Sequence, residues 1–108
     1  MLNGQGTSIR YNSIPNFPKT KVVGHAGLLQ IGDAAVLRGR SHYYEGHSMQ
    51  EIVRPVRVLA ELGVETIVLT NAAGTVNSKY KPGELMMIED HLNFMGGNPL
   101  RGANLEEL

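Results

Sequence analysis

The chain has 108 residues, 42% of them apolar, and its ten basic side chains balance ten acidic ones. This length allows one small domain with a core but not two, so we expect residues 1–108 to form a single domain. The zero net charge and the lack of a Lys/Arg run exclude a broadly basic surface for nucleic acid or membranes, so a small anion needs a local site.

The N-terminal third predicts an irregular lead-in followed by a hairpin. Residues 1–13 mix Gly, Asn and Ser with scattered apolar positions, and the proline-containing stretch behind them continues in the same way, so no regular element is expected there. Short β-prone runs at 21–23 and 28–31 predict strands. Residues 32–33, Gly-Asp, offer a tight turn into a further strand at 34–38.

A helix is predicted after the hairpin. Ser48 and Glu51 have the capping-box spacing, in which the Ser hydroxyl accepts a hydrogen bond from the backbone three residues on and the Glu reaches back. Apolar residues recur behind them at helical spacing, and Gly63 stands where a left-handed residue ends a helix. Pro55 lies inside this stretch and is expected to bend the helix or to restrict its first turns.

A second strand of a parallel pair is predicted after the helix. The β-branched run at 64–70 is typical of a buried parallel strand, and it completes a βαβ unit with the strand before the helix. We expect one more strand at 85–88, after a turn at 81–83, and a loop at 93–99. The predicted fold class is therefore α/β, with a partial mixed sheet that contains a βαβ unit.

Two loops of this fold carry the candidate chemistry. Because parallel strands share a carboxyl edge, the loop at 39–46 and the loop at 71–75 should face each other. The first contains Arg40 and His42, and the second has small side chains that leave backbone amides free. A guanidinium fork together with free amides suits an oxyanion such as phosphate. The alternatives are surface roles for the two charged side chains and a plain close-packing turn at Ala-Ala-Gly.

No metal centre or hydrolytic carboxylate pair is predicted. The four histidines form no His-Glu-x-x-His pattern, and no acidic cluster has ligand spacing, so zinc is not expected. His42 is the expected ligand contact, since an imidazole near neutral pH can donate to a phosphate oxygen. His25, His47 and His91 are expected to make local hydrogen bonds. Glu45 is expected to orient its neighbours or to face solvent.

The sequence also predicts a soluble protein of the cytoplasm. The chain has no cysteine, which excludes a disulfide framework, a thiol nucleophile and a thiolate metal site. No basic region followed by an apolar run marks a leader, and no stretch of about eighteen apolar residues could span a bilayer.

Six blocks of the sequence resemble purine nucleoside phosphorylases of the homotrimeric class. In order, from about Ile14 to the end, they are IPNFP at 14–18, GHAG at 24–27, GRSHYYEGH at 39–47, TNAAGTVN at 70–77, PGELMMIEDHLN at 82–93 and NPLRGAN at 98–104. Their number, order and spacing make accidental similarity a poor explanation. The resemblance implies that the chain is a fragment of the nucleoside phosphorylase fold.

The resemblance also implies a phosphate site. Arg40 and His42 would contact phosphate and act as the catalytic residues. The backbone amide of Ala72 would assist them, with His25 close to the anion. Phosphate would then attack the anomeric carbon of the nucleoside, aided by positioning and by electrostatic stabilisation of an oxocarbenium-like state.

A nucleoside pocket is implied beside the phosphate. Tyr44 would reach the ribose, and the backbone of Ala72, Ala73 and Gly74 would line the purine side. The expected reaction converts inosine or guanosine into the free base and ribose 1-phosphate, as in purine salvage. Inorganic phosphate would be a co-substrate, and no metal or organic cofactor is implied. The resemblance further implies a homotrimer without nucleic-acid or membrane partners.

The chain also departs from the family pattern. The family's Gly-Ser-Gly phosphate loop has no counterpart before Ile14, and the residues that grip the purine would follow Leu108. The hairpin before Arg40 is short, which is expected to affect the register leading into that residue. Ser41 and His47 replace other residue types that are usual in the family, as does the threonine after NAAG.

Two alternative functions remain open at this point. The first is a non-catalytic fragment, which would be a phosphate binder, an assembly module or a gene remnant, because a sheet without its neighbouring strands exposes apolar edges. The second is the methylthioadenosine phosphorylase branch, which shares the fold and the phosphate chemistry. The NAAG motif at 71–74 and the segment at 44–46 resemble the nucleoside branch more closely.

Overall fold

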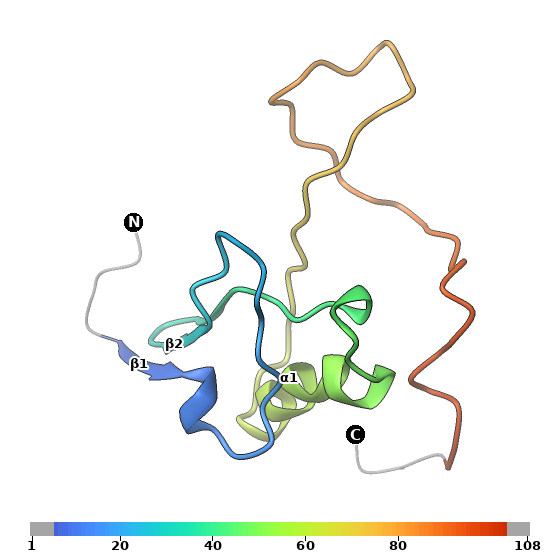
Figure 1. Ribbon diagram of the computed structural model, residues 1–108. Coiled ribbons are helices and arrows are strands. Elements are labelled where there is room, and N and C mark those ends of the chain that lie inside the picture. The colour runs from blue at the N-terminus through green and yellow to red at the C-terminus, as the bar shows by residue number, and fades with distance from the viewer. Residues whose placement is uncertain (1–5, 104–108) are drawn as a thin grey trace.

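The computed structural model describes residues 6–103. It contains three strands, one α-helix and two short 3-10 helices, followed by a long segment without regular structure (Figure 1). In chain order the elements are β1 (Thr7–Arg10), η1 (Tyr11–Ser13), β2 (Leu28–Ile31), β3 (Ala35–Arg38), η2 (Tyr43–Glu45) and α1 (Met49–Glu61).

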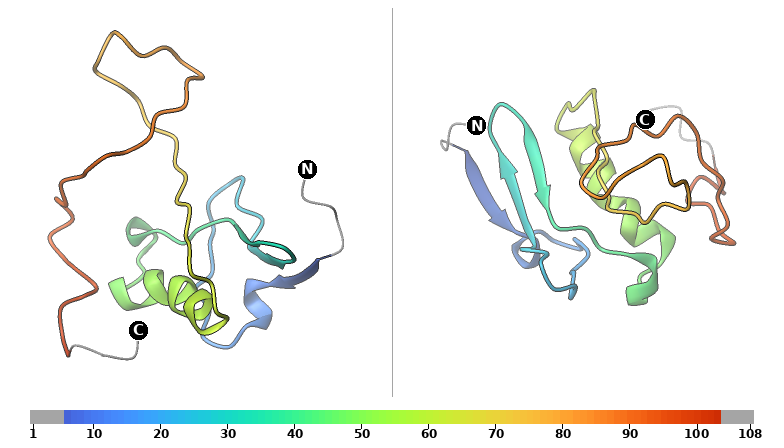
Figure 2. Two further views of the ribbon diagram at one scale, coloured as in Figure 1. Left: turned by 180° about the vertical axis from the view of Figure 1, so that it is seen from behind. Right: turned by 90° about the horizontal axis from the view of Figure 1, so that it is seen from above.

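The three strands form one antiparallel sheet in the order β1-β2-β3 (Figure 2, right). In the β2–β3 hairpin Leu28 pairs with Arg38 and Ile31 pairs with Ala35. The predicted hairpin is therefore confirmed, with the second strand beginning one residue later than expected. Its loop is closed by a hydrogen bond from the Gly32 N–H to the Ala34 carbonyl oxygen at 3.2 Å.

Two predictions for the N-terminal part are wrong. Residues 7–13 are not an irregular lead-in, because β1 pairs along β2, with Ile9 opposite Leu29, and η1 follows it. The run at 21–23 is not a strand, since the His25 N–H donates to the Val22 carbonyl oxygen and closes a turn. Pairing with a distant strand outweighs the local composition in β1, whereas a local turn replaces the expected strand at 21–23.

Helix α1 begins and ends where the sequence predicts. The Ser48 N–H donates to the Glu51 carboxylate at 2.7 Å, and the Glu51 N–H donates to the Ser48 hydroxyl at 3.3 Å, which completes the capping box. Gly63, with φ of +82°, follows the last turn. The helix runs through Pro55, at the loss of one backbone hydrogen bond. Within residues 6–103 no helix is long and apolar enough to cross a membrane.

The core lies between the sheet and α1. Among residues 6–103 its buried apolar side chains come from η1, the following loop, β2 and the helix, and half-buried side chains that include Leu37 of β3 and Val64 pack against them. The four buried side chains are Tyr11, Phe17, Leu29 and Leu59. Such a small core leaves stability sensitive to any one of its members.

The segment after the helix takes no regular structure. The predicted strands at 64–70 and 85–88 do not form among residues 6–103. The βαβ unit therefore lacks its second strand, and the sheet is antiparallel and not mixed, so these predictions are wrong for the described residues. The segment runs away from the sheet and then turns back toward α1 (Figures 1 and 2). Val64 packs against the core, but most of the large apolar side chains that follow it, including Val68 and Leu85, are exposed. An isolated extended run has neither hydrogen-bonding neighbours nor buried area to hold it as a strand.

The turn and loop predicted in this segment are confirmed. The Glu84 N–H donates to the Lys81 carbonyl oxygen at 3.2 Å, which closes the turn before the apolar run. Residues 93–99 form a loop that docks near the start of α1, where the Gln50 amide donates to the Pro99 carbonyl oxygen at 3.1 Å.

Candidate functional site

Arg40 follows β3 and is held through its backbone. Gly39 precedes it with φ of +119°, in the left-handed region that favours glycine. The Arg40 N–H donates to Nδ1 of His25 at 3.1 Å, and the same nitrogen lies 2.8 Å from the Arg40 carbonyl oxygen. A bare Nδ1 accepts the first of these hydrogen bonds, and a protonated Nδ1 donates the second. His25 therefore keeps a hydrogen bond to the Arg40 backbone in either tautomer.

The Arg40 side chain is exposed and remains available as a donor. Its guanidinium makes one hydrogen bond within the described part of the chain, from Nη1 to the Thr70 carbonyl oxygen at 3.4 Å. No carboxylate within residues 6–103 forms an ion pair with it. Because a guanidinium carries five N–H donors, most of them are free to bind an anion in a fork.

The contact with Thr70 also brings the two candidate loops together. Thr70 lies two residues before Ala72, and the backbone N–H groups of residues 72–74 make no hydrogen bond among residues 6–103. The expected free amides are therefore present in the loop that begins two residues after the carbonyl group that Arg40 contacts. The described contacts between these loops do not place Ala72, Ala73 or Gly74 against His42 itself.

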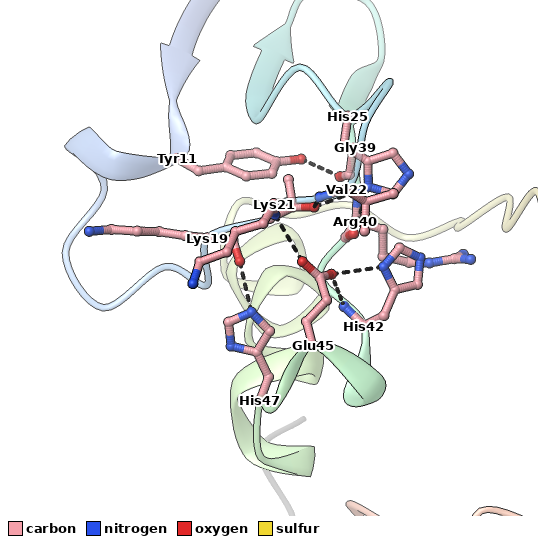
Figure 3. Close-up of polar contacts among 11 residues, drawn as sticks. Tyr11, Lys19, Lys21, Val22, His25, Gly39, Arg40, His42, Glu45 and His47 are labelled. Carbon is pink, nitrogen blue, oxygen red and sulfur yellow. Dashed lines mark hydrogen bonds and ion pairs between the residues drawn. The ribbon is translucent and has the colours of Figure 1, made fainter.

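His42 is oriented by Glu45 (Figure 3). The Glu45 carboxylate accepts from the His42 backbone N–H at 2.8 Å and lies 2.9 Å from Nδ1 of the His42 ring. Its other oxygen accepts from the Lys21 N–H at 2.8 Å. These hydrogen bonds, that from Lys21 first, lower the pKa of Glu45 from 4.5 to about 2.

This geometry fixes the proton on the His42 ring. An ionised carboxylate only accepts, so Nδ1 of His42 must carry the shared proton, and Nε2 is left for a ligand. A neutral ring can accept at Nε2 from a protonated phosphate oxygen, and a protonated ring can donate to an unprotonated one. Of the two roles expected for Glu45, the structure confirms that it orients its neighbours.

Three rings stack beside Arg40. The His25 and His42 rings lie 5.1 Å apart between centroids, and the His42 and Tyr44 rings lie 4.8 Å apart. Tyr44 is 75% exposed, so its outer face and hydroxyl are open to a ligand. The structure thus brings together four of the predicted site residues, from the loop after β3 and the turn before β2.

The remaining polar residues near this loop have local roles. His47 donates from Nε2 to the Lys19 carbonyl oxygen at 2.7 Å, as expected for a locally bonded histidine. A hollow of about 380 Å³ lies beside it, and of the candidate loop only Glu45 lines that hollow. Ser41 is buried, and its hydroxyl has no hydrogen-bond partner in the described structure. Residues 6–103 contain no group of three metal-ligating side chains.

Replacement of Gly39 by alanine is expected to distort this site. An added Cβ would lie 2.9 Å from Cβ of His25 and would have to adopt the positive φ. We expect a loss of about 1–3 kcal/mol in the free energy of unfolding and weaker phosphate binding, measured by urea denaturation and phosphate titration. Gly32→Ala is the matched control, because its Cβ would meet only an ordinary contact at 3.7 Å. Equal stability of the two variants would contradict the assigned strain.

The Glu45 hydrogen bonds predict a dependence of stability on acid. The pKa of Glu45 in the folded chain is below its ordinary value of 4.5, so the unfolded chain binds the proton more readily. Its contribution to stability is therefore full above about pH 4.5 and is lost as the pH falls toward about 2. Glu45→Gln should remove this part of the acid destabilisation, as measured by urea midpoints at several pH values.

A carboxylate outside the site provides the control for this test. Glu65 is exposed and accepts no hydrogen bond within the described residues. Glu65→Gln is expected to preserve the acid dependence of the wild-type chain. If Glu45→Gln also preserved it, the hydrogen bonds to Glu45 would not contribute to folding.

Comparison with known proteins supports a common origin for this whole stretch. The family model described as the phosphorylase superfamily matches residues 4–107, so the similarity begins ahead of Ile14. "Purine nucleoside phosphorylase 1" of Geobacillus stearothermophilus is 52% identical over 105 residues, which are 93% of this chain and 38% of that protein. "Purine nucleoside phosphorylase 1" of Bacillus subtilis is 50% identical over 101 residues, covering 89% of this chain and 37% of that protein.

A mammalian relative gives a similar result. "Purine nucleoside phosphorylase" of Rattus norvegicus is 48% identical over 110 residues, covering 94% of this chain and 38% of that protein. The chain thus spans less than two fifths of the length of these curated relatives.

Proposed function

This chain belongs to the phosphorylase superfamily, and from this premise we propose that it carries the phosphate-binding part of a purine nucleoside phosphorylase. The reaction is the phosphorolysis of purine nucleosides such as inosine and guanosine. Inorganic phosphate is the co-substrate, the products are the free purine base and ribose 1-phosphate, and no organic cofactor takes part. Relatives named purine nucleoside phosphorylase, about half identical over nearly the whole chain, support this assignment.

The observation that carries the proposal is the exposed guanidinium of Arg40, two residues before the oriented imidazole of His42, with the His25 ring bonded to the Arg40 backbone. The Arg40 guanidinium uses one N–H donor within the described residues, so its other donors can bind an anion. Nδ1 of His42 is bonded to Glu45, which leaves Nε2 for a ligand, and the His25 ring stacks on the His42 ring. An oxyanion bound here would receive charge-assisted hydrogen bonds, which are the stronger kind. The free N–H of Ala72 lies on the neighbouring loop and would add a backbone donor.

In the proposed reaction these residues hold the nucleophile. A phosphate oxygen forms a bond to the anomeric carbon as the bond from that carbon to the purine nitrogen breaks, and the electron pair leaves with the base. Arg40 and His42 are the proposed catalytic residues because they bind and position the attacking phosphate. Tyr44 would contact the ribose through its exposed face, and the backbone of Ala72, Ala73 and Gly74 would line the purine side.

Several finer features belong to the same proposal. We place the protein in the cytoplasm and in a homotrimer, as the resemblance to the homotrimeric class implies. The methylthioadenosine branch is less favoured, because the relatives named above carry purine nucleoside phosphorylase names. A non-catalytic phosphate-binding role is the competing function for the isolated 108-residue chain, since so much apolar surface of residues 64–95 is exposed.

The proposal is tested by the release of hypoxanthine from inosine by the purified chain, with and without inorganic phosphate. Phosphate-dependent release that greatly exceeds release from methylthioadenosine supports nucleoside phosphorolysis. Phosphate binding without turnover supports the non-catalytic role. A folded chain that neither binds phosphate nor releases the base would contradict both functions.

A further inference from the structure

Tyr11 contacts the ends of all three strands next to the proposed phosphate site, and Figure 3 shows its contact with Gly39. It follows β1, and its backbone N–H donates to the Gly27 carbonyl oxygen at 2.9 Å, just before β2. Its hydroxyl donates to the Gly39 carbonyl oxygen at 2.6 Å, just after β3. The side chain is 4% exposed, and its ring packs on Phe17 at 4.7 Å between centroids. Tyr11 is therefore a fixed donor at the point where the sheet leads into the loop.

The hydroxyl bonds to the peptide group that leads into Arg40. The Gly39 carbonyl and the Arg40 N–H belong to one planar peptide unit. The Tyr11 hydroxyl donates to the oxygen of this peptide unit, and the N–H of the same unit donates to Nδ1 of His25 at 3.1 Å. Gly39 has no Cβ to limit rotation, so an unheld peptide plane at this position could turn over at little cost. Two side chains from separate segments thus hold this plane in one orientation.

The two holding contacts respond differently to protonation. The His25 ring nitrogen changes from acceptor to donor with its tautomer, and as a donor it faces the Arg40 carbonyl oxygen at 2.8 Å. Burial raises the pKa of the Tyr11 hydroxyl to about 12, so that group stays protonated at neutral pH. The Tyr11 hydrogen bond is therefore the one that persists through either state of His25.

We propose that Tyr11 is a positioning residue of the oxyanion site, acting through Gly39 to fix the direction in which the Arg40 side chain leaves the backbone. This inference rests on the proposed phosphate-binding function of Arg40. Forked hydrogen bonds depend on the position and angle of the guanidinium, so a turned peptide plane weakens them even when the fold survives. Tyr11 acts on the backbone and not on the anion.

The test is a titration of isotope-labelled chain with inorganic phosphate, followed by nuclear magnetic resonance. Tyr11→Phe removes the hydroxyl and keeps the ring that packs on Phe17. We expect it to weaken phosphate affinity on the order of threefold to tenfold and to speed hydrogen exchange of the Arg40 amide, while exchange of the Leu29 amide in β2 is unchanged. A purely structural role would speed exchange at both amides together.

Tyr80→Phe is the matched control, because the Tyr80 hydroxyl makes no hydrogen bond within residues 6–103. It should leave the phosphate affinity and both exchange rates at their wild-type values. A Tyr11→Phe chain with wild-type affinity and a wild-type Arg40 exchange rate would overturn the proposal, as would equal acceleration at Arg40 and Leu29.

Failure of the underlying function gives a different result. If the wild-type chain does not respond to phosphate, the phosphate function itself fails, and with it the role of Tyr11 in anion binding. If Tyr11→Phe does not fold, the phosphate titration of the wild-type chain tests whether Tyr11 is coupled to the anion site. A shift of the Tyr11 ring signals that saturates together with the Arg40 amide supports the coupling, and Tyr11 signals that stay constant while the Arg40 amide saturates overturn it.

Discussion

Arg40→Ala is expected to remove phosphate binding almost completely, with a loss in affinity of about 100-fold or more. Two charge-assisted hydrogen bonds of about 1.5 kcal/mol each account for a loss of this size. The Arg40 guanidinium is exposed and has no carboxylate partner among residues 6–103, so its removal leaves the fold intact. Phosphate titration measures the affinity, and inosine phosphorolysis by any active preparation should fall in parallel.

Two further variants separate charge from geometry at this position. Arg40→Lys keeps the positive charge but loses the planar fork, so it should bind phosphate with an intermediate affinity. Arg57→Ala removes an exposed arginine of α1 that makes no side-chain hydrogen bond within the described chain, and it should bind like the wild type. If Arg57→Ala lost as much affinity as Arg40→Ala, the binding would reflect overall charge and not this site.

Leu29→Ala is expected to destabilise the chain by about 2–5 kcal/mol, which is enough to unfold much of it at room temperature. Leu29 is only 2% exposed and lies in β2, in a core that has four buried apolar side chains among residues 6–103. Truncation there leaves a cavity and removes apolar contacts, and the core is too small for other side chains to fill the space. Urea denaturation followed by circular dichroism measures the loss.

Leu85→Ala makes the same chemical change at a fully exposed position. Its side chain is 102% exposed, so truncation removes no buried contact, and we expect a change within about 0.5 kcal/mol. The comparison locates the core of the isolated chain. A cost for Leu85→Ala as large as that for Leu29→Ala would mean that the segment after the helix is packed in solution.

The sequence predicted the elements whose signals are local. The start of α1 follows from Ser48 and Glu51, and its end follows from Gly63, because caps satisfy backbone groups within one turn of the chain. The β2–β3 hairpin follows from two short β-prone runs and the turn between them. None of these signals depends on a distant residue.

Elements that need a distant partner were not predictable in the same way. The short polar strand β1 exists because Ile9 pairs opposite Leu29, which nothing in the local composition of residues 7–10 indicates. The run at 64–70 has a strong β-strand composition, but it lacks a neighbouring strand among residues 6–103 and stays extended and exposed. Composition measures the tendency to pair, and pairing itself requires the second strand.

The candidate site shows the same division. By itself the sequence determined which groups stand close together along the chain, since Arg40, His42 and Tyr44 lie within five residues, and the family blocks assigned them to phosphate and sugar. Only the tertiary structure decided how those groups are held. The Glu45 carboxylate accepts a hydrogen bond from Nδ1 of His42, and the Tyr11 hydroxyl donates to a carbonyl oxygen 28 positions further along the chain. Such hydrogen bonds depend on distances and angles that arise after the strands pair, so no local pattern of residue types specifies them.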